Sequence, residues 1–383
     1  MMIRFLAFLL LFFPLSANAQ LQVDITSGRV EPMPIAIPNF YANDDIGNQM
    51  AGVIRTNLEF SGLFKPLDPN AFIQPPMSLA NEGPRFPEWR PLGAQALVSG
   101  TIALQPNGQY KVDYRLFDVS LGSQIDGMSY TTNADNWRRI AHIISDKIFE
   151  RLTGEKGFFD TRIVYIAESG GMKNRVKRLA IMDQDGANHR YLTDGSYLVL
   201  TPRFSPNAQE IVYMSYFRNR PRVYLYNIDT GQQRVLGDFP GMTFSPRFSP
   251  DGNSVAMSLS ENGSSNIYVL NIRSGAKRRL TNTRDIDTSP SFSPDGNRIV
   301  FESDRSGSQQ LYVMNADGSN AQRITFEKGR YASPVWSPRG DYIAFTKMRD
   351  GKFYIGLIKP DGSGERLIST ARHVEGPSWA PNG

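Results

Sequence analysis

Histidine is the residue best suited to metal or acid–base chemistry, and this chain has three. His142, His189 and His373 lie far apart, without a His-x-x-x-His or Glu-x-x-His pattern. A zinc site needs three or four ligands from neighbouring elements. The chain has no cysteine, which excludes disulfides, thiolate ligands and a cysteine nucleophile. The sequence therefore predicts no metal site.

Two acidic motifs are weaker candidates. Asp183-Gln184-Asp185-Gly186 is similar to the start of a calcium loop but lacks the further oxygen ligands, so we interpret it as a hairpin turn. Asp304 and Arg305 are expected to form an ion pair at a loop. The chain contains neither a Gly-x-Ser-x-Gly elbow nor a glycine-rich phosphate loop. We therefore expect no catalysis and no cofactor.

The main candidate site is a set of residues that directly precede a repeated proline motif. The set does not consist of turn formers, and several members are larger apolar residues than a solvated loop needs. Grouped apolar residues on a surface are typical of a protein-binding patch. The repeat described below would bring these residues together around the mouth of a central channel. The alternative is that these side chains plug the channel. The members are Val199, Leu200, Thr201, Met242, Phe244, Ser245, Thr288, Ser289, Tyr331, Ala332, Val374 and Glu375.

A rival hypothesis is a propeller enzyme or gating domain, either a metal-dependent lactonase-like protein or a peptidase-associated one. That chemistry needs three or more carboxylates lining the channel. At the predicted mouth only Asp287 and Glu375 qualify. The residue types therefore favour an interaction protein.

The element that must position this set is a repeat of about 44 residues. Its motif is Pro-x-aromatic-Ser-Pro or a close variant, and its aromatic residue recurs in steps of 44, 44, 44 and 43, at Phe204, Phe248, Phe292, Trp336 and Trp379. Each unit continues with two strands, a hairpin turn and a short fourth strand. A period in the forties with these signals indicates a β-propeller, in which the aromatic residues pack between blades.

The number of repeats predicts six blades, the last incomplete. The first unit begins at Ile163 without the proline motif, and the last consists of that motif alone. Propeller rings normally close when the C-terminal end lends the first blade a strand. We therefore expect a chain shortened by about one repeat, with a gap in the sixth blade.

Other segments precede the repeats. Residues 1–19 read as a signal peptide, with Arg4, an apolar run and Ala17-Asn18-Ala19, although an uncut anchor is the alternative. Residues 20–34 are an edge strand or a mobile tail that could add a strand to a partner. Residues 35–155 predict an α/β domain, with helices from Ile46 and over Trp137–Leu152 and His142 off the apolar stripe of the second. Residues 161–383 form the propeller.

Composition adds limits. The net charge of +5 is spread along the chain, which does not indicate nucleic-acid binding. No stretch after the signal segment approaches 18 consecutive apolar residues, so we expect no membrane span in the mature chain.

Taken together, the chain resembles the TolB family, periplasmic components of the Tol–Pal system of Gram-negative bacteria. The resemblance rests on the Ala-x-Ala signal, the small α/β domain with its closing helix, the Leu152-Thr153-Gly154 and Thr161-Arg162-Ile163 junction, and the Phe-Ser-Pro-Asp-Gly ladder. It implies an α/β domain followed by a six-bladed β-propeller, no catalysis, a periplasmic location and a monomer.

The resemblance also implies partners. The lipoprotein Pal would bind across the propeller mouth, where Thr288 and its neighbours match best in type. Met242 and Ser289 depart from the expected residues. TolA would bind the N-terminal segment, here Leu21, Val23, Ile25 and Arg29. Other outer-membrane or peptidoglycan-associated proteins are further possible partners. The implied role is outer-membrane integrity and constriction at cell division.

Overall fold

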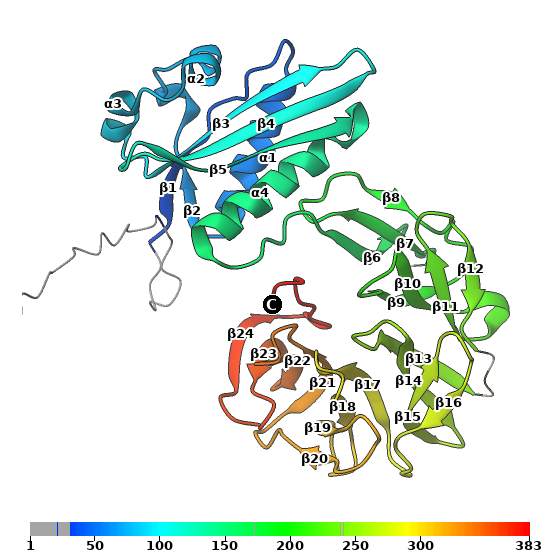
Figure 1. Ribbon diagram of the computed structural model, residues 1–383. Coiled ribbons are helices and arrows are strands. Elements are labelled where there is room, and N and C mark those ends of the chain that lie inside the picture. Colours follow the sequence, from blue (N-terminus) through cyan, green and yellow to red (C-terminus); the bar gives the residue numbers. More distant parts are fainter. Residues whose placement is uncertain (1–20, 22–30, 172, 238, 240) are drawn as a thin grey trace, which may run out of the picture. The chain divides into compact units, whose positions relative to one another are not determined.

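The computed structural model describes residue 21 and residues 31–383, apart from 172, 238 and 240 (Figure 1). The chain divides into two compact units, residues 1–159 and 160–383. No helix among the described residues is long and apolar enough to cross a membrane. The predicted signal peptide lies outside the described residues.

The first unit is built on one five-stranded sheet of order β2-β1-β3-β4-β5. Strand β1 pairs in parallel with β2 and β3, and β3, β4 and β5 form an antiparallel meander. The strands are β1 (Met33–Ala36), β2 (Phe64–Pro66), β3 (Ala96–Leu104), β4 (Gln109–Asp118) and β5 (Ser123–Asn133). The helices are α1 (Ile46–Phe60), α2 (Pro76–Glu82), α3 (Phe86–Trp89) and α4 (Trp137–Thr153).

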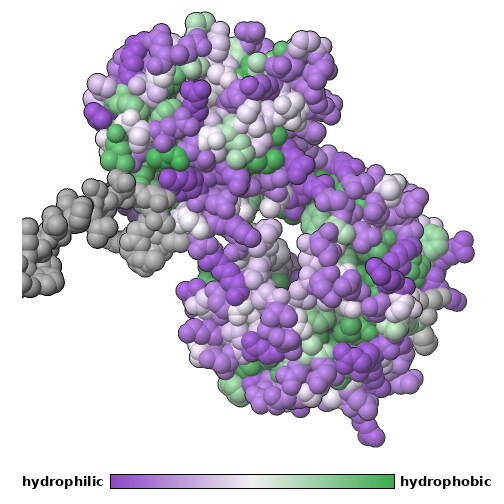
Figure 2. All heavy atoms as spheres, viewed as in Figure 1, coloured by the Kyte–Doolittle hydropathy of each residue, from purple (hydrophilic) through white to green (hydrophobic). Residues whose placement is uncertain are grey.

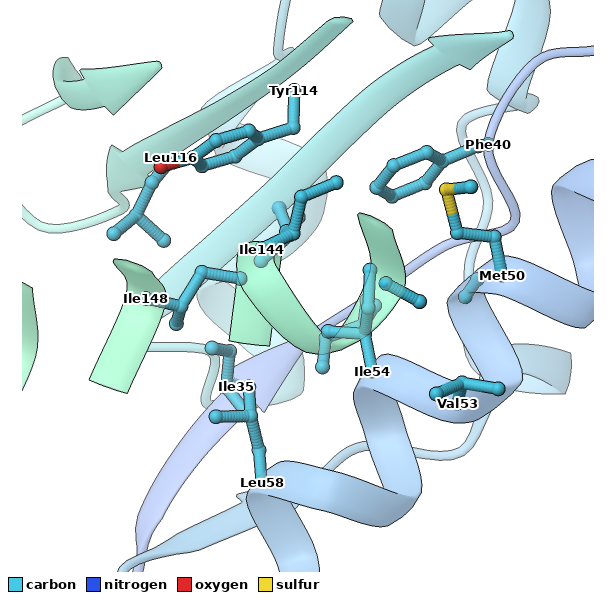
Figure 3. Packing of buried hydrophobic residues seen from close by; sticks show 14 of the residues in the cluster. Ile35, Phe40, Met50, Val53, Ile54, Leu58, Tyr114, Leu116, Ile144 and Ile148 are labelled. Carbon is cyan, nitrogen blue, oxygen red and sulfur yellow. The ribbon is translucent and has the colours of Figure 1, made fainter. Parts of the chain in front are cut away.

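Helices α1 and α4 bury their apolar stripes against this sheet. Ile54 on α1 and Ile144 on α4 are fully buried in the same cluster as Ile35 of β1 (Figure 3). Gly154 ends α4 in the left-handed conformation, as expected of a C-cap glycine. His142, which the sequence places off the apolar stripe, is nevertheless buried, and its ring lies 2.9 Å from the Asn57 side chain on α1. A polar contact between two packed helices explains its burial.

The described residues of the second unit form five sheets, each an antiparallel meander. The first has three strands, β6 (Arg162–Ser169), β7 (Val176–Asp183) and β8 (Arg190–Tyr191). The other four sheets have four strands each. They are β9 (Val199–Phe204) to β12 (Gln233–Val235), β13 (Met242–Phe248) to β16 (Lys277–Arg279), β17 (Asp287–Phe292) to β20 (Gln322–Arg323), and β21 (Arg330–Trp336) to β24 (Arg366–Ala371).

The middle strands of these four sheets carry most of the buried side chains. They are β10 (Glu210–Ser215), β11 (Arg222–Asn227), β14 (Ser254–Glu261), β15 (Ser264–Asn271), β18 (Arg298–Ser303), β19 (Gln310–Asn315), β22 (Ile343–Arg349) and β23 (Lys352–Ile358). Their apolar clusters bridge neighbouring sheets: Val212 of β10 packs with Val255 of β14, and Ile267 of β15 packs with Phe301 of β18. Stacked blades, rather than single sheets, therefore form the core.

The prediction of six blades was wrong, because five sheets form in the described chain. The segment expected to begin a sixth sheet, residues 372–383, contains no strand. It is tied to the preceding blade: Trp379 Nε1 donates to the carbonyl of Val335 at 3.0 Å. No described strand pairs with it, and a β-ladder requires a neighbour.

Candidate functional site

The residues before four of the prolines lie in the first strand of a blade, not in irregular loops as expected, whereas Val374 and Glu375 lie in no strand. In β9, Val199 and Leu200 pair with Ser215 and Met214 of β10. In β17, Asp287 and Thr288 pair in the same way with Ser303 and Glu302 of β18. The members of the predicted set in β9, β13, β17 and β21 are thus held by ladder hydrogen bonds, which position them more firmly than a loop would.

Burial divides the set by its position before the proline. The third residue before the proline is buried in all four described sheets that begin with the motif: Val199, Thr243, Asp287 and Tyr331. The second and first residues are mostly half-buried, including Leu200, Phe244, Ala332, Thr201, Ser245 and Ser289. Thr288 is buried, Val374 is half-buried, and Met242 and Glu375 are exposed. The available surface is therefore a row of half-buried residues, one or two per blade.

The residue directly before each proline has a left-handed backbone. The φ angles are 48° at Thr201, 53° at Ser245, 53° at Ser289, 51° at Ser333 and 68° at Gly376. The ladder register shifts at this point in all four inner strands, which is the mark of a β-bulge. The left-handed region costs an L-residue about 1–2 kcal/mol. The same left-handed conformation recurs at all five of these positions, so it is a regular feature of the proline motif.

The bulge aims a backbone N–H at the preceding blade. Ser333 N–H donates to Glu302 Oε2 at 3.4 Å, and Gly376 N–H donates to Thr346 Oγ1 at 3.0 Å. Glu302 and Thr346 occupy equivalent positions, 44 residues apart. The first contact links β21 to the second strand of the preceding sheet, and the second links the segment after β24 to β22.

Glu302 is the titratable group of this surface that the sequence reasoning missed. Burial raises its pKa to about 7, although bonds from the Ser333 N–H and the Thr288 hydroxyl oppose that shift. Asp304 adds a small further increase. The sequence signal that could have revealed it is an acid directly after the apolar run Ile299–Phe301. Thr346 occupies the same position one repeat later.

Asp287 is a satisfied structural carboxylate. Arg305 Nη2 contacts both of its oxygens at 2.8 and 2.9 Å, and the Thr283 hydroxyl donates to it at 3.1 Å. The expected Asp304–Arg305 pair was therefore the wrong pairing. Asp304 instead accepts from the Ile286 N–H at 2.8 Å. The reason is geometric, because the turn after β18 brings Arg305 to the start of β17.

Tyr331 is buried and does not present an apolar face to solvent. Its hydroxyl donates to Glu365 at 2.9 Å, and Lys347 Nζ lies 2.6 Å from the same carboxylate. Burial, followed by the charge and hydrogen bond of Glu365, raises the pKa of Tyr331 above its ordinary value. Its role here is to join β21 to β22 and the turn before β24.

The remaining candidates lie apart. His189 lies between the rings of Tyr165 and Tyr191, tilted against the first and edge-on to the second, and His373 contacts the ring of Phe353. Asp183–Gly186 forms a hairpin turn, as expected, with the Gly186 N–H donating to Asp183 O at 3.0 Å. Leu21 is half-buried against the core of the first unit. Val23, Ile25 and Arg29 lie outside the described residues.

The visible face of the protein is mostly hydrophilic, with scattered apolar residues in both units (Figure 2). In this view the apolar residues of the propeller form several separate areas among hydrophilic ones.

Two family models match the chain. One, described as the TolB beta propeller domain, matches residues 149–383, and the other, the TolB amino-terminal domain, matches residues 21–125. A curated relative, the Tol-Pal system protein TolB of Paramagnetospirillum magneticum, is 57% identical over 222 residues. That match covers 57% of this chain and 49% of the relative, so the chain spans about half the length of the curated relative it matches.

Two solved structures have a similar fold. The crystal structure of TolB from Acinetobacter baumannii is similar with a TM-score of 0.83 and 29% identity, covering 95% of this chain and 89% of the other. A protein from Agrobacterium tumefaciens, provisionally assigned to TolB, shares the fold with a TM-score of 0.50 and 23% identity, covering 57% and 86%.

Proposed function

The chain belongs to the TolB family, as its sequence resemblance predicts, and from that premise we propose that it is a non-enzymatic, periplasmic interaction component of the Tol–Pal system. In this proposal the propeller binds the lipoprotein Pal, and the N-terminal segment binds TolA. The complex would support outer-membrane integrity and constriction at division.

The observation that carries the Pal site is the repeated left-handed bulge. It holds Leu200, Phe244 and Ala332 half-buried at equivalent positions of three blades. Side chains fixed by ladder pairing lose little conformational entropy on binding, which favours affinity from a small apolar area. The polar residues beside them, Thr201, Ser245 and Ser289, could bond to a partner backbone.

The test is binding of purified Pal to the Phe244→Asp variant. A charge at the centre of an apolar contact should weaken binding at least tenfold, because it must be desolvated without a partner. Phe60→Asp is the matched control, since Phe60 is 73% exposed and lies at the end of α1 in the first unit, which contains none of the set. Equal loss of Pal binding in both variants, or no loss in either, would show that the residues before the prolines are not the Pal site.

The proposed TolA contact is tested separately. Removal of residues 22–30 leaves β1, which begins at Met33, intact. It should abolish capture of TolA and leave Pal binding unchanged. Loss of both would indicate a general folding defect instead.

A further inference from the structure

A cavity of about 210 Å³ lies among the inner strands of four blades. The residue between proline and the aromatic residue lines it in each of them: Arg203, Arg247, Ser291 and Val335. The aromatic residues Phe204, Phe248, Phe292 and Trp336 complete much of the wall. Equivalent positions of the repeat thus converge on one space, and two of them are arginines.

The two guanidinium groups have no acidic partner there. The residues that line the cavity include no carboxylate. Arg203 Nη1 donates to the carbonyl of Pro202 at 2.7 Å, but its Nε is sealed from solvent and has no acceptor within the described chain. The Arg247 backbone belongs to the β13–β14 ladder, but its guanidinium makes no hydrogen bond or ion pair with the described residues.

Burial and mutual repulsion both disfavour the charged forms of these two guanidinium groups. Burial lowers the pKa of Arg203 to about 10. It lowers the pKa of Arg247 well below its ordinary value, and the nearby charge of Arg203 adds to this effect. Both arginines remain protonated at neutral pH. Both side chains are half-buried, and two like charges held side by side without a counter-charge are stabilised by a ligand that supplies one.

We propose that this cavity binds an oxyanion, either a phosphate or a small carboxylate, between the guanidinium groups of Arg203 and Arg247. Arginine presents paired N–H donors that match the oxygens of both groups. Ser291 supplies a third donor, because its Oγ accepts from the Trp336 N–H at 3.2 Å and keeps its own proton for a ligand.

This site is separate from the proposed Pal surface. Its lining includes Pro206 and Pro250, which follow the ends of β9 and β13. The predicted residues that precede the proline motifs, called here the rim set, lie in the first halves of these strands. None of the rim residues lines the cavity. The two sites can therefore be tested independently.

The experiment is calorimetric titration of the full chain with inorganic phosphate, and separately with succinate, at constant ionic strength. We expect saturable binding of at least one of them, weakened at least tenfold in Arg247→Gln and in Arg203→Gln. Arg284→Gln is the matched control, because Arg284 is exposed and outside the cavity. Phosphate alone, succinate alone or competition between them identifies which oxyanion the site accepts.

Thermal unfolding separates binding from folding. A ligand that binds only the folded state raises Tm with its concentration. The Tm of the wild type and of Arg284→Gln should rise with the bound anion, and that of Arg247→Gln should not. Without anion, Arg247→Gln should be at least as stable as the wild type, because it removes a buried unpaired charge. No saturable binding by the folded wild type, or equal responses of Arg247→Gln and Arg284→Gln, would overturn the proposal.

Discussion

At the scale of single residues, the left-handed serines and threonine before the prolines are the least expected feature. A residue before proline normally adopts an extended backbone. Here Ser245, Ser289 and Ser333 have φ angles of 51–53°, and each sits in a bulge. The surrounding ladder therefore maintains a conformation that the local sequence disfavours.

This strain is measurable by substitution. Ser289→Gly should stabilise the protein by about 0.5–1 kcal/mol, because relief of the left-handed strain exceeds the entropy cost of glycine. Ser289→Val should destabilise it by about 1–2 kcal/mol. Urea unfolding measures both, with Ser306→Gly as a control at a residue without positive φ, where glycine should lose stability. A destabilised Ser289→Gly would contradict the assignment.

Glu302 gives a pH prediction. Its folded pKa of about 7 exceeds the ordinary value of 4.5, so the folded state holds the proton more tightly than the unfolded state. The stability gained from this proton is full below pH 4.5 and is lost as the pH rises through about 7. The loss should be roughly 2–3 kcal/mol.

Glu302→Gln should lack this loss. The measurement is the difference in unfolding free energy between the variant and the wild type from pH 4.5 to 8, since other carboxylates contribute equally to both. The variant should gain relative stability as the pH rises. A constant difference would show that Glu302 titrates normally.

At the scale of elements, each blade is secured by specific polar ties as well as apolar stacking. The Arg305–Asp287 pair joins the turn after β18 to the start of β17, and Asp287 is fully buried. Removal of one member of such a pair leaves an uncompensated buried charge, whereas removal of both need not.

Arg305→Met should therefore destabilise the protein by about 3–5 kcal/mol. The double variant Arg305→Met with Asp287→Asn should recover more than half of this loss. Denaturant unfolding of the two single variants and the double variant forms the cycle. Additive losses would mean that the two side chains do not act as a pair.

At the scale of the whole molecule, two units carry separate cores. The cluster of the first unit contains Ile54, Ile144 and Ile35 and no residue of the propeller (Figure 3). The propeller has instead a series of clusters between blades. Units with separate cores unfold as separate transitions when few interactions couple them.

Calorimetry of the Ile54→Ala variant tests this. The cavity left in the first core should cost about 2–5 kcal/mol and lower the midpoint of one transition only. Val300→Ala, in a cluster between blades, is the matched change in the second unit and should lower the other transition. A common shift of all transitions in both variants would show one cooperative molecule.

The sequence was sufficient for whatever depends on local pattern. The 44-residue period identified the propeller, and the stripes at Ile46–Leu58 and Ile140–Leu152 identified two helices of the mixed domain. The number of blades, by contrast, does not follow from local sequence pattern. Residues 377–383 carry the same motif as four true inner strands, but a strand forms only beside a partner.

The sequence by itself thus determined the repeat, the order of the two units and the family, since periodicity and turn chemistry act between near neighbours. Only the tertiary structure decided which members of the rim set are exposed. It also decided that Tyr331 and Asp287 form hydrogen bonds or ion pairs inside the protein, and that Glu302 is a buried acid. It also brought Arg203 and Arg247, one repeat apart, to a single cavity. These properties depend on how successive blades pack side by side, which places residues far apart in the chain in one low-dielectric environment.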